Sequence, residues 1–380
     1  MIYFDNAATS YPKPQNIALM LQNAIYNYGA NPGRSGHSFS VKTARMVYEC
    51  RENIQELFNV SDPEKVVFTQ NCTHALNMAI KGIMLSGGHA IISSLEHNSV
   101  LRPLHELKKR KIADYSVANV SEDDETTIES FRNLIRNDTK AIICTHASNV
   151  CGVVMPVKEI GALAHENGLL FIVDAAQTAG MLPIDIQEMN IDILCMPGHK
   201  GLYGPFGTGV MIVNCDTMMD TIIEGGTGSN SLIIEQPDFL PDRFESGTIN
   251  VCGIAGLNSG VNFVKKNGIN KMYQDEMSLL RRCYNGLKKN PAVIFYTNPP
   301  QLYKNVPILS FNIEGKDSLK TVERLNKYSF ALRGGFHCSL LAHEWLGTSE
   351  IGTVRASFGA FNNENQIMRF IDIIKKLSKS

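Results

Sequence analysis

Two ionisable residues follow strongly apolar stretches of the chain. Asp174 ends the run LLFIVD, and Lys200 lies among glycines in GHKGLYGPFGTG, between two further apolar runs. An unpaired buried carboxylate costs several kcal/mol, so Asp174 implies a buried cationic partner. A lysine in such a place is usually kept for its amine chemistry, either as a Schiff base or as a phosphate ligand. Both residues are therefore candidates for a catalytic site.

Two familiar nucleotide-binding motifs also use glycine and lysine, but neither fits this chain. A Walker-type phosphate loop needs GxxxxGK[ST] between a strand and a helix. Here Gly201 follows Lys200, and the next expected element is a strand. The dinucleotide fingerprint GxGxxG does not open the first helix either. The lysine therefore favours Schiff-base chemistry.

Further polar residues follow the other apolar runs of the first two thirds of the chain. In open α/β sheets, ligands bind at the carboxyl ends of the strands, so these residues are expected to meet at one edge. Taken alone, Asn149 also reads as a turn residue and His97 as a surface histidine. The polar residues that follow an apolar run are Gln70, Asn71, Cys72, Thr73, His74, His97, Asn149, Asp174, Gln177, His199 and Lys200.

Together these side chains describe a pyridoxal phosphate site. Lys200 would hold the cofactor as an imine, and Asp174 would keep the pyridine nitrogen protonated, so that the ring acts as an electron sink. His97 would stack on the ring, and Gln177 would hydrogen-bond the ring oxygen. The backbone amides of residues 72–73, at a helix N-terminus, would bind the phosphate.

The elements that must position these residues alternate between strand and helix. Short runs rich in Val and Ile read as buried strands, and the amphipathic stretches between them, such as CTHALNMAIKGIM (72–84), read as helices. In PVKEIGALAHENG, Pro156 suits a helix start and Gly168 a helix end. This repetition predicts an α/β fold with a mostly parallel sheet covered on both faces. The expected strands are 66–69, 90–94, 141–148, 169–177, 192–197 and 209–214.

The pattern changes after about Asn262. Helical segments are followed by the strand-like VPILSFNIEG and FALRGG, and then by a capped terminal helix in NNENQIMRFIDIIKKLSKS. At 380 residues the chain is long for one hydrophobic core. We therefore expect a large cofactor-binding domain over residues 13–262 and a smaller α+β domain over residues 263–380, which residues 1–12 join.

Charge and composition argue against several classes of partner. The chain has 36 Lys+Arg and 37 Asp+Glu, a formal net charge of −1, which gives no electrostatic reason to bind nucleic acid or an anionic membrane. The longest apolar runs are shorter than a membrane span, and no export signal is visible at the N-terminus. Nine cysteines lie without a CxxC or paired spacing, which favours reduced thiols in the cytoplasm and predicts no metal site.

The chain resembles a known family, the class V aminotransferases, which belong to the fold-type I pyridoxal phosphate-dependent transferases. Within it, the chain is similar to the NifS-like cysteine desulfurases and selenocysteine lyases. The resemblance implies a large domain with a mostly parallel seven-stranded sheet, and a homodimer with a shared active site. The motifs that carry it run almost end to end: YFDNAATS, NPGRSGH, VVFTQNCTHALN, SSLEHNS, HASNVCG, VDAAQTAG, PGHKGLYGP, RFESGTIN, RGGFHC and VRASFG.

The resemblance also implies a role for individual residues. Thr248 would reach the phosphate of the other subunit, and the Arg355 guanidinium would clamp the substrate carboxylate. The implied cofactor-binding residues are Cys72, Thr73, His97, Asn149, Asp174, Gln177, His199, Lys200 and Thr248. The implied catalytic residues are Lys200, Cys338 and His97, and the implied substrate-binding residues are Arg355, Arg333 and Asn31. The chain departs from the family where Pro197 replaces a frequent serine and where Cys72 replaces the first of two threonines.

The reaction depends on Cys338, in the stretch LRGGFHCSLLAH. Family members with a short cysteine loop have RxGHHC there, whereas this chain has Phe336 in place of the first histidine. His337 either helps to deprotonate the thiol or only shapes the loop. Three alternatives remain for Cys338: a packed structural thiol, a zinc ligand with His337 and His343, or a residue that the chemistry does not use.

We expect a cysteine desulfurase that converts L-cysteine to L-alanine and carries the sulfur on Cys338 as a persulfide, for transfer to a sulfur-acceptor protein. The alternatives within the enzyme class are a selenocysteine lyase acting on L-selenocysteine, a cysteine sulfinate desulfinase, and a class V aminotransferase or lyase that does not use Cys338. Outside it, the alternative is a non-catalytic scaffold or sulfur-relay partner.

Overall fold

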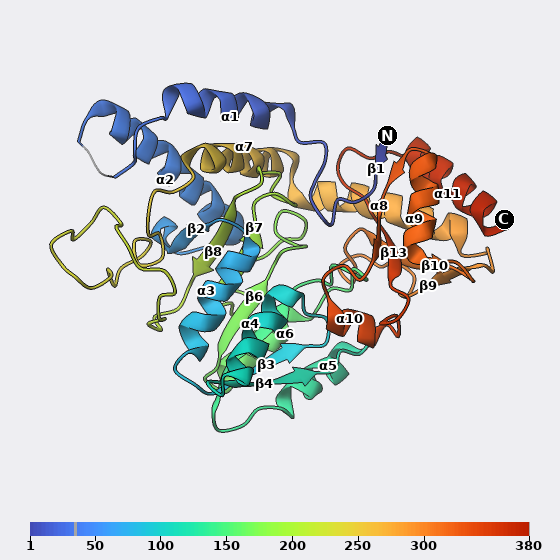
Figure 1. Ribbon diagram of the computed structural model, residues 1–380, viewed down its shortest axis with the longest axis horizontal. Coiled ribbons are helices and arrows are strands. Elements are labelled where there is room, and N and C mark those ends of the chain that lie inside the picture. The colour runs from blue at the N-terminus through green and yellow to red at the C-terminus, as the bar shows by residue number, and fades with distance from the viewer. Residues whose placement is uncertain (34–35, 380) are drawn as a thin grey trace.

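The computed structural model describes residues 1–33 and 36–379, and its centre is a seven-stranded sheet (Figure 1). β8 is antiparallel to both of its neighbours, and all the other pairs are parallel. This arrangement confirms the mostly parallel sheet. In spatial order the strands are β2 (Val66–Thr69), β8 (Gly209–Val213), β7 (Ile193–Pro197), β6 (Leu170–Asp174), β5 (Thr139–Thr145), β3 (His89–Ser93) and β4 (Asp114–Ala118).

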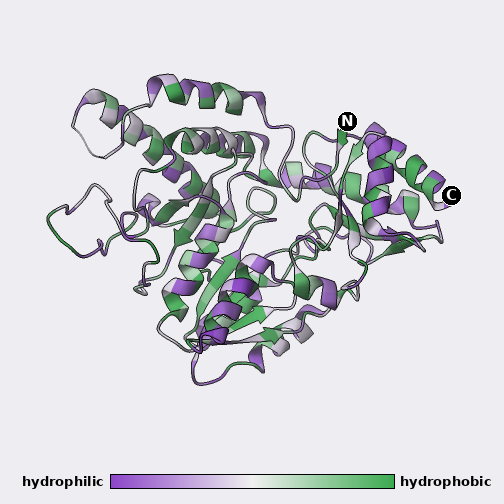
Figure 2. Ribbon diagram, viewed as in Figure 1, coloured by the Kyte–Doolittle hydropathy of each residue, from purple (hydrophilic) through white to green (hydrophobic). Residues whose placement is uncertain are grey.

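Helices cover both faces of this sheet, which is why its strands read as nearly continuous apolar runs (Figure 2). Successive side chains of a strand point to opposite faces, so Ile91 and Ile142 join one core and Ile92 and Ile143 join the other. The first core includes α2 (Ser38–Phe58), α5 (Asp124–Arg132), α6 (Val157–Glu166) and α7 (Val251–Asn267), and α1 (Gln15–Asn27) packs on α7. The second includes α3 (Cys72–Met84) and α4 (Asn98–Lys109).

Most of the predicted elements of this part are present. The expected helix over 72–84 coincides with α3. Pro156 is the N-cap residue of α6, and Gly168 follows its C-cap with φ of 66°. The expected strands do not include β4, an edge strand whose residues DYSVA are mostly half-buried and therefore form no apolar run.

A second, antiparallel sheet lies in the C-terminal part of the chain, with the order β12-β13-β10-β9. The N-terminal strand β1 (Ile2–Tyr3) pairs with β11 (Phe330–Ala331), so the chain's first residues join this part. The division into domains at residue 262 stays a prediction, since α7 passes through that position without a break. The other elements are β9 (Val293–Phe295), β10 (Ile308–Ile313), β12 (Arg333–Gly335), β13 (Thr353–Ser357), α8 (Ile269–Leu287), α9 (Ser318–Lys327), α10 (Leu340–Trp345) and α11 (Glu364–Lys379).

Candidate active site

A cavity lies at the carboxyl ends of the parallel strands, between the large sheet and the antiparallel sheet. Thr145, Asp174 and Pro197, the last residues of β5, β6 and β7, line it from one side, and β12 and β13 contribute an arginine each from the other. Its position agrees with the general rule for open α/β sheets. The expected site residues that line it are Cys72, Thr73, His97, Asn149, Asp174, Gln177, His199, Lys200, Arg333 and Arg355.

Asp174 is buried at this cavity, and Lys200 is half-buried beside it. Asp174 Oδ1 accepts hydrogen bonds from the Ala176 N–H at 2.9 Å and from the Cys72 thiol at 3.5 Å. Burial raises the pKa of Asp174, while the Ala176 hydrogen bond and the Lys200 charge oppose the shift. Burial lowers the pKa of Lys200 and so favours the neutral amine that Schiff-base formation needs. Because the hydrogen-bond donors to Asp174 are neutral, a protonated ring nitrogen would supply the cation that its burial calls for.

His97 precedes α4, and hydrogen bonds at the helix start fix its ring. Nδ1 accepts from the Ser99 N–H at 3.1 Å and lies 2.8 Å from Ser99 Oγ, which in turn lies 2.7 Å from Thr73 Oγ1. Burial, followed by the Lys200 charge, lowers the pKa of His97 to about 4, so the ring is neutral at pH 7. A neutral ring held in place is suited to stack on a flat cofactor. The sequence did not single out Ser99, because a serine in a helix's first turn is common.

The start of α3 offers a place for a phosphate. The Asn71 side chain caps the helix by accepting from the His74 N–H at 2.9 Å, and the first N–H groups of a helix lack intrahelical partners. His199 Nδ1 is buried and has no hydrogen-bond partner among the described residues. Burial, followed by the Lys200 charge, lowers the pKa of His199 to about 4. A phosphate would give this orphaned atom a partner, so the donor set fits pyridoxal phosphate, and Pro197 adds no hydroxyl to it.

Two arginines face the cavity from neighbouring strands of the small sheet. Arg333 and Arg355 are directly paired residues of β12 and β13, and Arg355 is only 1% exposed. Arg355 Nη2 forms an ion pair with Asp5 Oδ1 at 2.7 Å, Nη1 donates to the Asn149 carbonyl at 2.8 Å, and Nε has no partner in the described chain. Burial lowers the pKa of Arg355, and Asp5 opposes this shift. Two guanidinium groups beside one cavity create a site for an anion such as a carboxylate.

The cysteine loop between β12 and α10 directs two neighbouring side chains to different places. His337 and Cys338 both have left-handed backbone conformations, with φ of 48° and 60°. His337 is 2% exposed, and its Nε2 lies 3.0 Å from the Thr353 carbonyl, while Cys338 is exposed. Burial, followed by the Arg355 charge, lowers the pKa of His337 to about 2. Of the two roles open for His337, this geometry favours that of shaping the loop, because its ring bonds Thr353.

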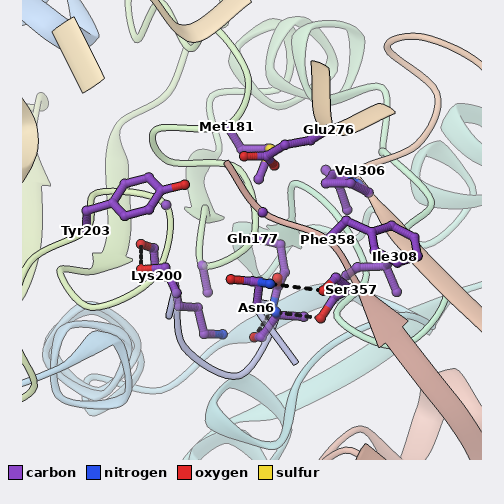
Figure 3. Close-up of a pocket in the computed structure, with 16 residues that line it drawn as sticks. Asn6, Gln177, Met181, Lys200, Tyr203, Glu276, Val306, Ile308, Ser357 and Phe358 are labelled. Carbon is purple, nitrogen blue, oxygen red and sulfur yellow. Dashed lines mark hydrogen bonds between the residues drawn. The ribbon is translucent and has the colours of Figure 1, made fainter. Parts of the chain in front are cut away.

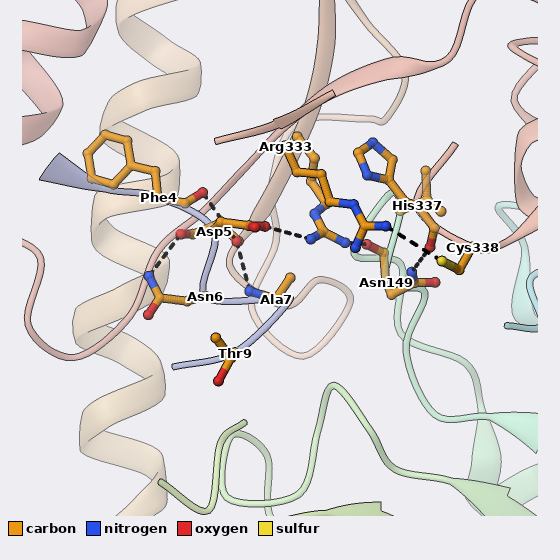
Figure 4. A network of polar contacts seen from close by, with 12 residues as sticks. Phe4, Asp5, Asn6, Ala7, Thr9, Asn149, Arg333, His337 and Cys338 are labelled. Atoms are coloured by element: carbon orange, nitrogen blue, oxygen red, sulfur yellow. Dashed lines mark hydrogen bonds and ion pairs between the residues drawn. The ribbon is translucent and has the colours of Figure 1, made fainter. Parts of the chain in front are cut away.

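Cys338 itself is not among the residues that line the cavity, but it lies beside Arg333, which is one of them (Figure 4). Arg333 Nη2 is 3.5 Å from its Sγ, and its carbonyl accepts from the Asn98 N–H at 2.9 Å. The Asn149 side chain bonds the residues on either side of Cys338. Its Nδ2 donates to the His337 carbonyl at 2.7 Å, and its Oδ1 accepts from Ser339 Oγ at 2.6 Å. The amide of Asn149 therefore supports the cysteine loop, and its expected contact with the ring oxygen stays a prediction.

Some expected residues lie elsewhere, and some residues at the site were not predicted. Thr248 is exposed and lines a separate cavity, and Asn31 is an exposed residue whose carbonyl accepts from Ser40 Oγ. Arg34 and Ser35, in the same motif as Asn31, lie outside the described residues. Asp5, which the sequence analysis missed, reaches the site from the YFDNAATS motif. In the same segment, the Ala7 carbonyl accepts from Gln177 Nε2 at 3.1 Å.

Residues 1–33 and 36–379 contain neither a cluster of metal ligands nor a membrane-spanning helix. No three His, Cys, Asp or Glu side chains are grouped so that they could hold a metal ion, including His337, His343 and Cys338. Across the same residues, every helix is too short or too polar to cross a membrane.

Comparison with known proteins agrees with this site. The family described as Aminotransferase class-V matches residues 2–370. A probable cysteine desulfurase of Pyrococcus abyssi is 31% identical over 388 residues, which cover 100% of this chain and 95% of that protein. A probable cysteine desulfurase of Methanothermobacter thermautotrophicus is 30% identical over 387 residues, which cover 99% of this chain and 94% of that protein. The apo structure of cysteine desulfurase from Thermococcus onnurineus NA1 matches with a TM-score of 0.90 and 29% identity, covering 100% of this chain and 94% of that one. The chain therefore belongs to the class V aminotransferase family of pyridoxal phosphate-dependent enzymes, as its motifs predict.

Proposed function

We propose that this protein is a cysteine desulfurase, which converts L-cysteine to L-alanine and retains the sulfur as a persulfide on Cys338. The observation that carries the proposal is an exposed thiol at the edge of the cofactor cavity, with Cys338 Sγ 3.5 Å from Arg333 Nη2. The names of the relatives support the same reaction. The overall conversion balances: L-cysteine and the Cys338 thiol give L-alanine and the Cys338 persulfide.

The residues of the large sheet prepare the α-carbon of the substrate. When bound, pyridoxal phosphate supplies an electron sink that stabilises negative charge at this carbon. Lys200 Nζ, in its neutral form, takes the α-proton and later returns a proton as the product forms. Asp174 would keep the ring nitrogen protonated, and the neutral His97 would pack on the ring face. Burial lowers the pKa of Lys200 and of His97, as these roles need. It raises the pKa of Asp174, and the charge of a protonated ring nitrogen would oppose that shift and favour the carboxylate.

The cysteine loop presents the nucleophile. Asn149 and Asn98 fix the backbone around Cys338, so that the thiol stays at the cavity edge while its side chain remains accessible. Arg333 lies beside the sulfur and stabilises the thiolate that attacks the substrate sulfur. The exposed Phe336 gives the entrance an apolar side next to this charged group.

Arg355 is the proposed clamp for the substrate carboxylate. Arg355→Ala should weaken the binding of L-cysteine and of L-alanine alike, by about 2–5 kcal/mol, because a buried carboxylate loses its partner. Arg355→Lys keeps the charge but not the bidentate fork, so we expect a smaller loss. Spectral titration of the bound cofactor with each amino acid measures both effects. A loss confined to one amino acid would contradict the clamp.

The direct test of the function is the release of alanine by the loaded wild-type enzyme. L-cysteine, L-selenocysteine and L-cysteine sulfinate are supplied separately, and alanine is quantified for each. We expect alanine from L-cysteine together with a persulfide on the protein. Alanine from L-selenocysteine alone would instead establish a selenocysteine lyase, and no alanine from any of the three would reject the proposal.

A homodimer, a sulfur-acceptor protein and a cytoplasmic location complete the proposal. Thr248 is exposed and lines a cavity other than its own chain's cofactor cavity, which suits a residue that serves the other subunit. Leu232 and Ile234, on the preceding loop, are apolar and 101% and 99% exposed, so a partner surface would shield them. The nine cysteines are free thiols, in keeping with a reducing compartment. Sedimentation equilibrium of the loaded protein measures the subunit number, and a fully active monomer would exclude the shared site.

A further inference from the structure

A second cavity adjoins the cofactor cavity behind the loop that carries Lys200 (Figure 3). The two cavities share Ala7, Ala176, Gln177 and Lys200 in their walls. The second cavity extends to α8 and β13 and encloses about 30 Å³ that water-sized groups can occupy. This space is enough for one water molecule or one small ion without its hydration shell.

Glu276 of α8 lines this cavity, and no cationic side chain of the described residues pairs with it. The residue is 1% exposed, and neither carboxylate oxygen has a hydrogen-bond partner within 3.5 Å in the described chain, although the Tyr203 hydroxyl lies close enough to interact with the carboxylate. Over the same residues, none of the ion pairs within 4.0 Å involves Glu276. In Figure 3 the amino group of Lys200 points away from Glu276, whereas the Tyr203 hydroxyl is directed toward the side on which Glu276 lies. A buried carboxylate in such a place requires either a proton or a cation.

We propose that this cavity binds a monovalent cation, with Glu276 as its charged ligand and the Tyr203 hydroxyl as a neutral oxygen ligand. A single carboxylate balances a single positive charge, whereas protein sites for divalent calcium or magnesium usually combine several oxygen ligands with more negative charge. A water molecule would satisfy hydrogen bonds but would leave the charge uncompensated. Potassium, sodium and ammonium share this chemistry, and the experiment below separates them.

The ion would connect α8 with the loop that carries Lys200. That this loop is catalytic rests on the proposed function. Tyr203 follows Lys200 by three residues, and its N–H donates to the Lys200 carbonyl at 2.9 Å. Its φ of 56° is left-handed, a conformation that a non-glycine residue keeps only when its surroundings hold it. A cation between Tyr203 and Glu276 would help to hold this turn, and with it the backbone of Lys200.

The site should also respond to pH, because the cation competes with a proton. Burial, followed by the Asp275 charge, raises the pKa of Glu276 from 4.5 to about 8, while the Tyr203 hydroxyl opposes the shift. The unfolded chain loses this proton first, so without a cation the stability from Glu276 falls as pH rises from 4.5 to about 8. A bound cation would restore this stability, most strongly above pH 8, where Glu276 is ionised in the folded protein. Lys13, whose Nζ bonds Ser10 at the cavity wall, has a pKa lowered by burial to about 8 and titrates in the same range.

Thermal unfolding of the loaded enzyme tests the site. Chlorides of potassium, sodium, ammonium and choline are compared at equal ionic strength, at pH 6.5 and pH 8.5, with choline as a cation too large to enter. At pH 8.5 we expect at least one small cation to raise the Tm of the wild type by about 2 °C or more over choline, and the rise to be smaller at pH 6.5. Glu276→Gln removes the charge at constant shape and should abolish the difference at both pH values. Asp275→Asn, at the exposed neighbour on the same helix, should retain it.

Equal Tm values of the wild type in all four salts at pH 8.5 would overturn the proposal, and so would an unchanged salt response in Glu276→Gln. Diffraction from crystals grown in rubidium chloride gives a structural check, in which we expect an anomalous peak beside the Glu276 carboxylate. The absence of that peak would likewise reject the site. These measurements need no turnover, so a failure of the desulfurase assay would leave their outcome intact.

Discussion

Replacement of Lys200 by alanine is expected to abolish both the visible absorption of the bound cofactor and the release of alanine from L-cysteine. The amine is the group that we expect to anchor the cofactor covalently, and the same nitrogen is the proposed base, whose removal alone costs about 10²–10⁴-fold. We therefore expect activity at the background rate. The absorption spectrum of the purified variant, with added pyridoxal phosphate, measures the first effect.

An arginine variant separates covalent attachment from electrostatics. Lys200→Arg places a permanent positive charge at this position but cannot form a Schiff base, so it should lose the visible absorption as the alanine variant does. Borohydride reduction of the loaded wild type should leave the cofactor on the peptide that contains Lys200, as mass spectrometry would show. A visible band retained by Lys200→Ala, or the label on another peptide, would remove Lys200 from its assigned role.

The large sheet could be predicted well because its strands are buried on both faces. Such strands appear as short Val- and Ile-rich runs, and the polar residues that follow them mark one edge of the sheet. The residues Asp174, His199 and Lys200 were found in this way, and they line one cavity. The edge strand β4 was not predicted, because its half-buried residues form no such apolar run.

The contribution of the small sheet was harder to predict, because it depends on contacts between segments far apart in the chain. The ion pair of Asp5 with Arg355 joins residues 350 positions apart, and no local pattern reports it. Similarly, the sequence left the role of His337 open, whereas its burial against Thr353 follows from the register of β12 and β13. The two hydrogen bonds of the Asn149 side chain to the neighbours of Cys338 likewise cannot be read from the sequence.

Replacement of Cys338 by serine should separate sulfur transfer from the cofactor chemistry. The variant should keep the visible absorption, because the Cys338 side chain is not among the groups that line the cofactor cavity. Alanine release from L-cysteine should fall to background, since a hydroxyl at neutral pH is a far weaker nucleophile toward sulfur than a thiolate. Part of the activity on L-selenocysteine should remain, because selenium leaves carbon more readily than sulfur does.

A second thiol provides the matched control for this prediction. Cys215 is also partly accessible but lies outside the cofactor cavity, so Cys215→Ser should release alanine at the wild-type rate. Mass spectrometry after one turnover should find one extra sulfur atom on the peptide that contains Cys338 in the wild type and in Cys215→Ser, and none in Cys338→Ser. Unchanged desulfuration by Cys338→Ser would show that the sulfur leaves without this thiol. The enzyme would then be a lyase of the same family, in which Arg333 and Asn149 stabilise the cysteine loop for a purpose other than nucleophilic attack.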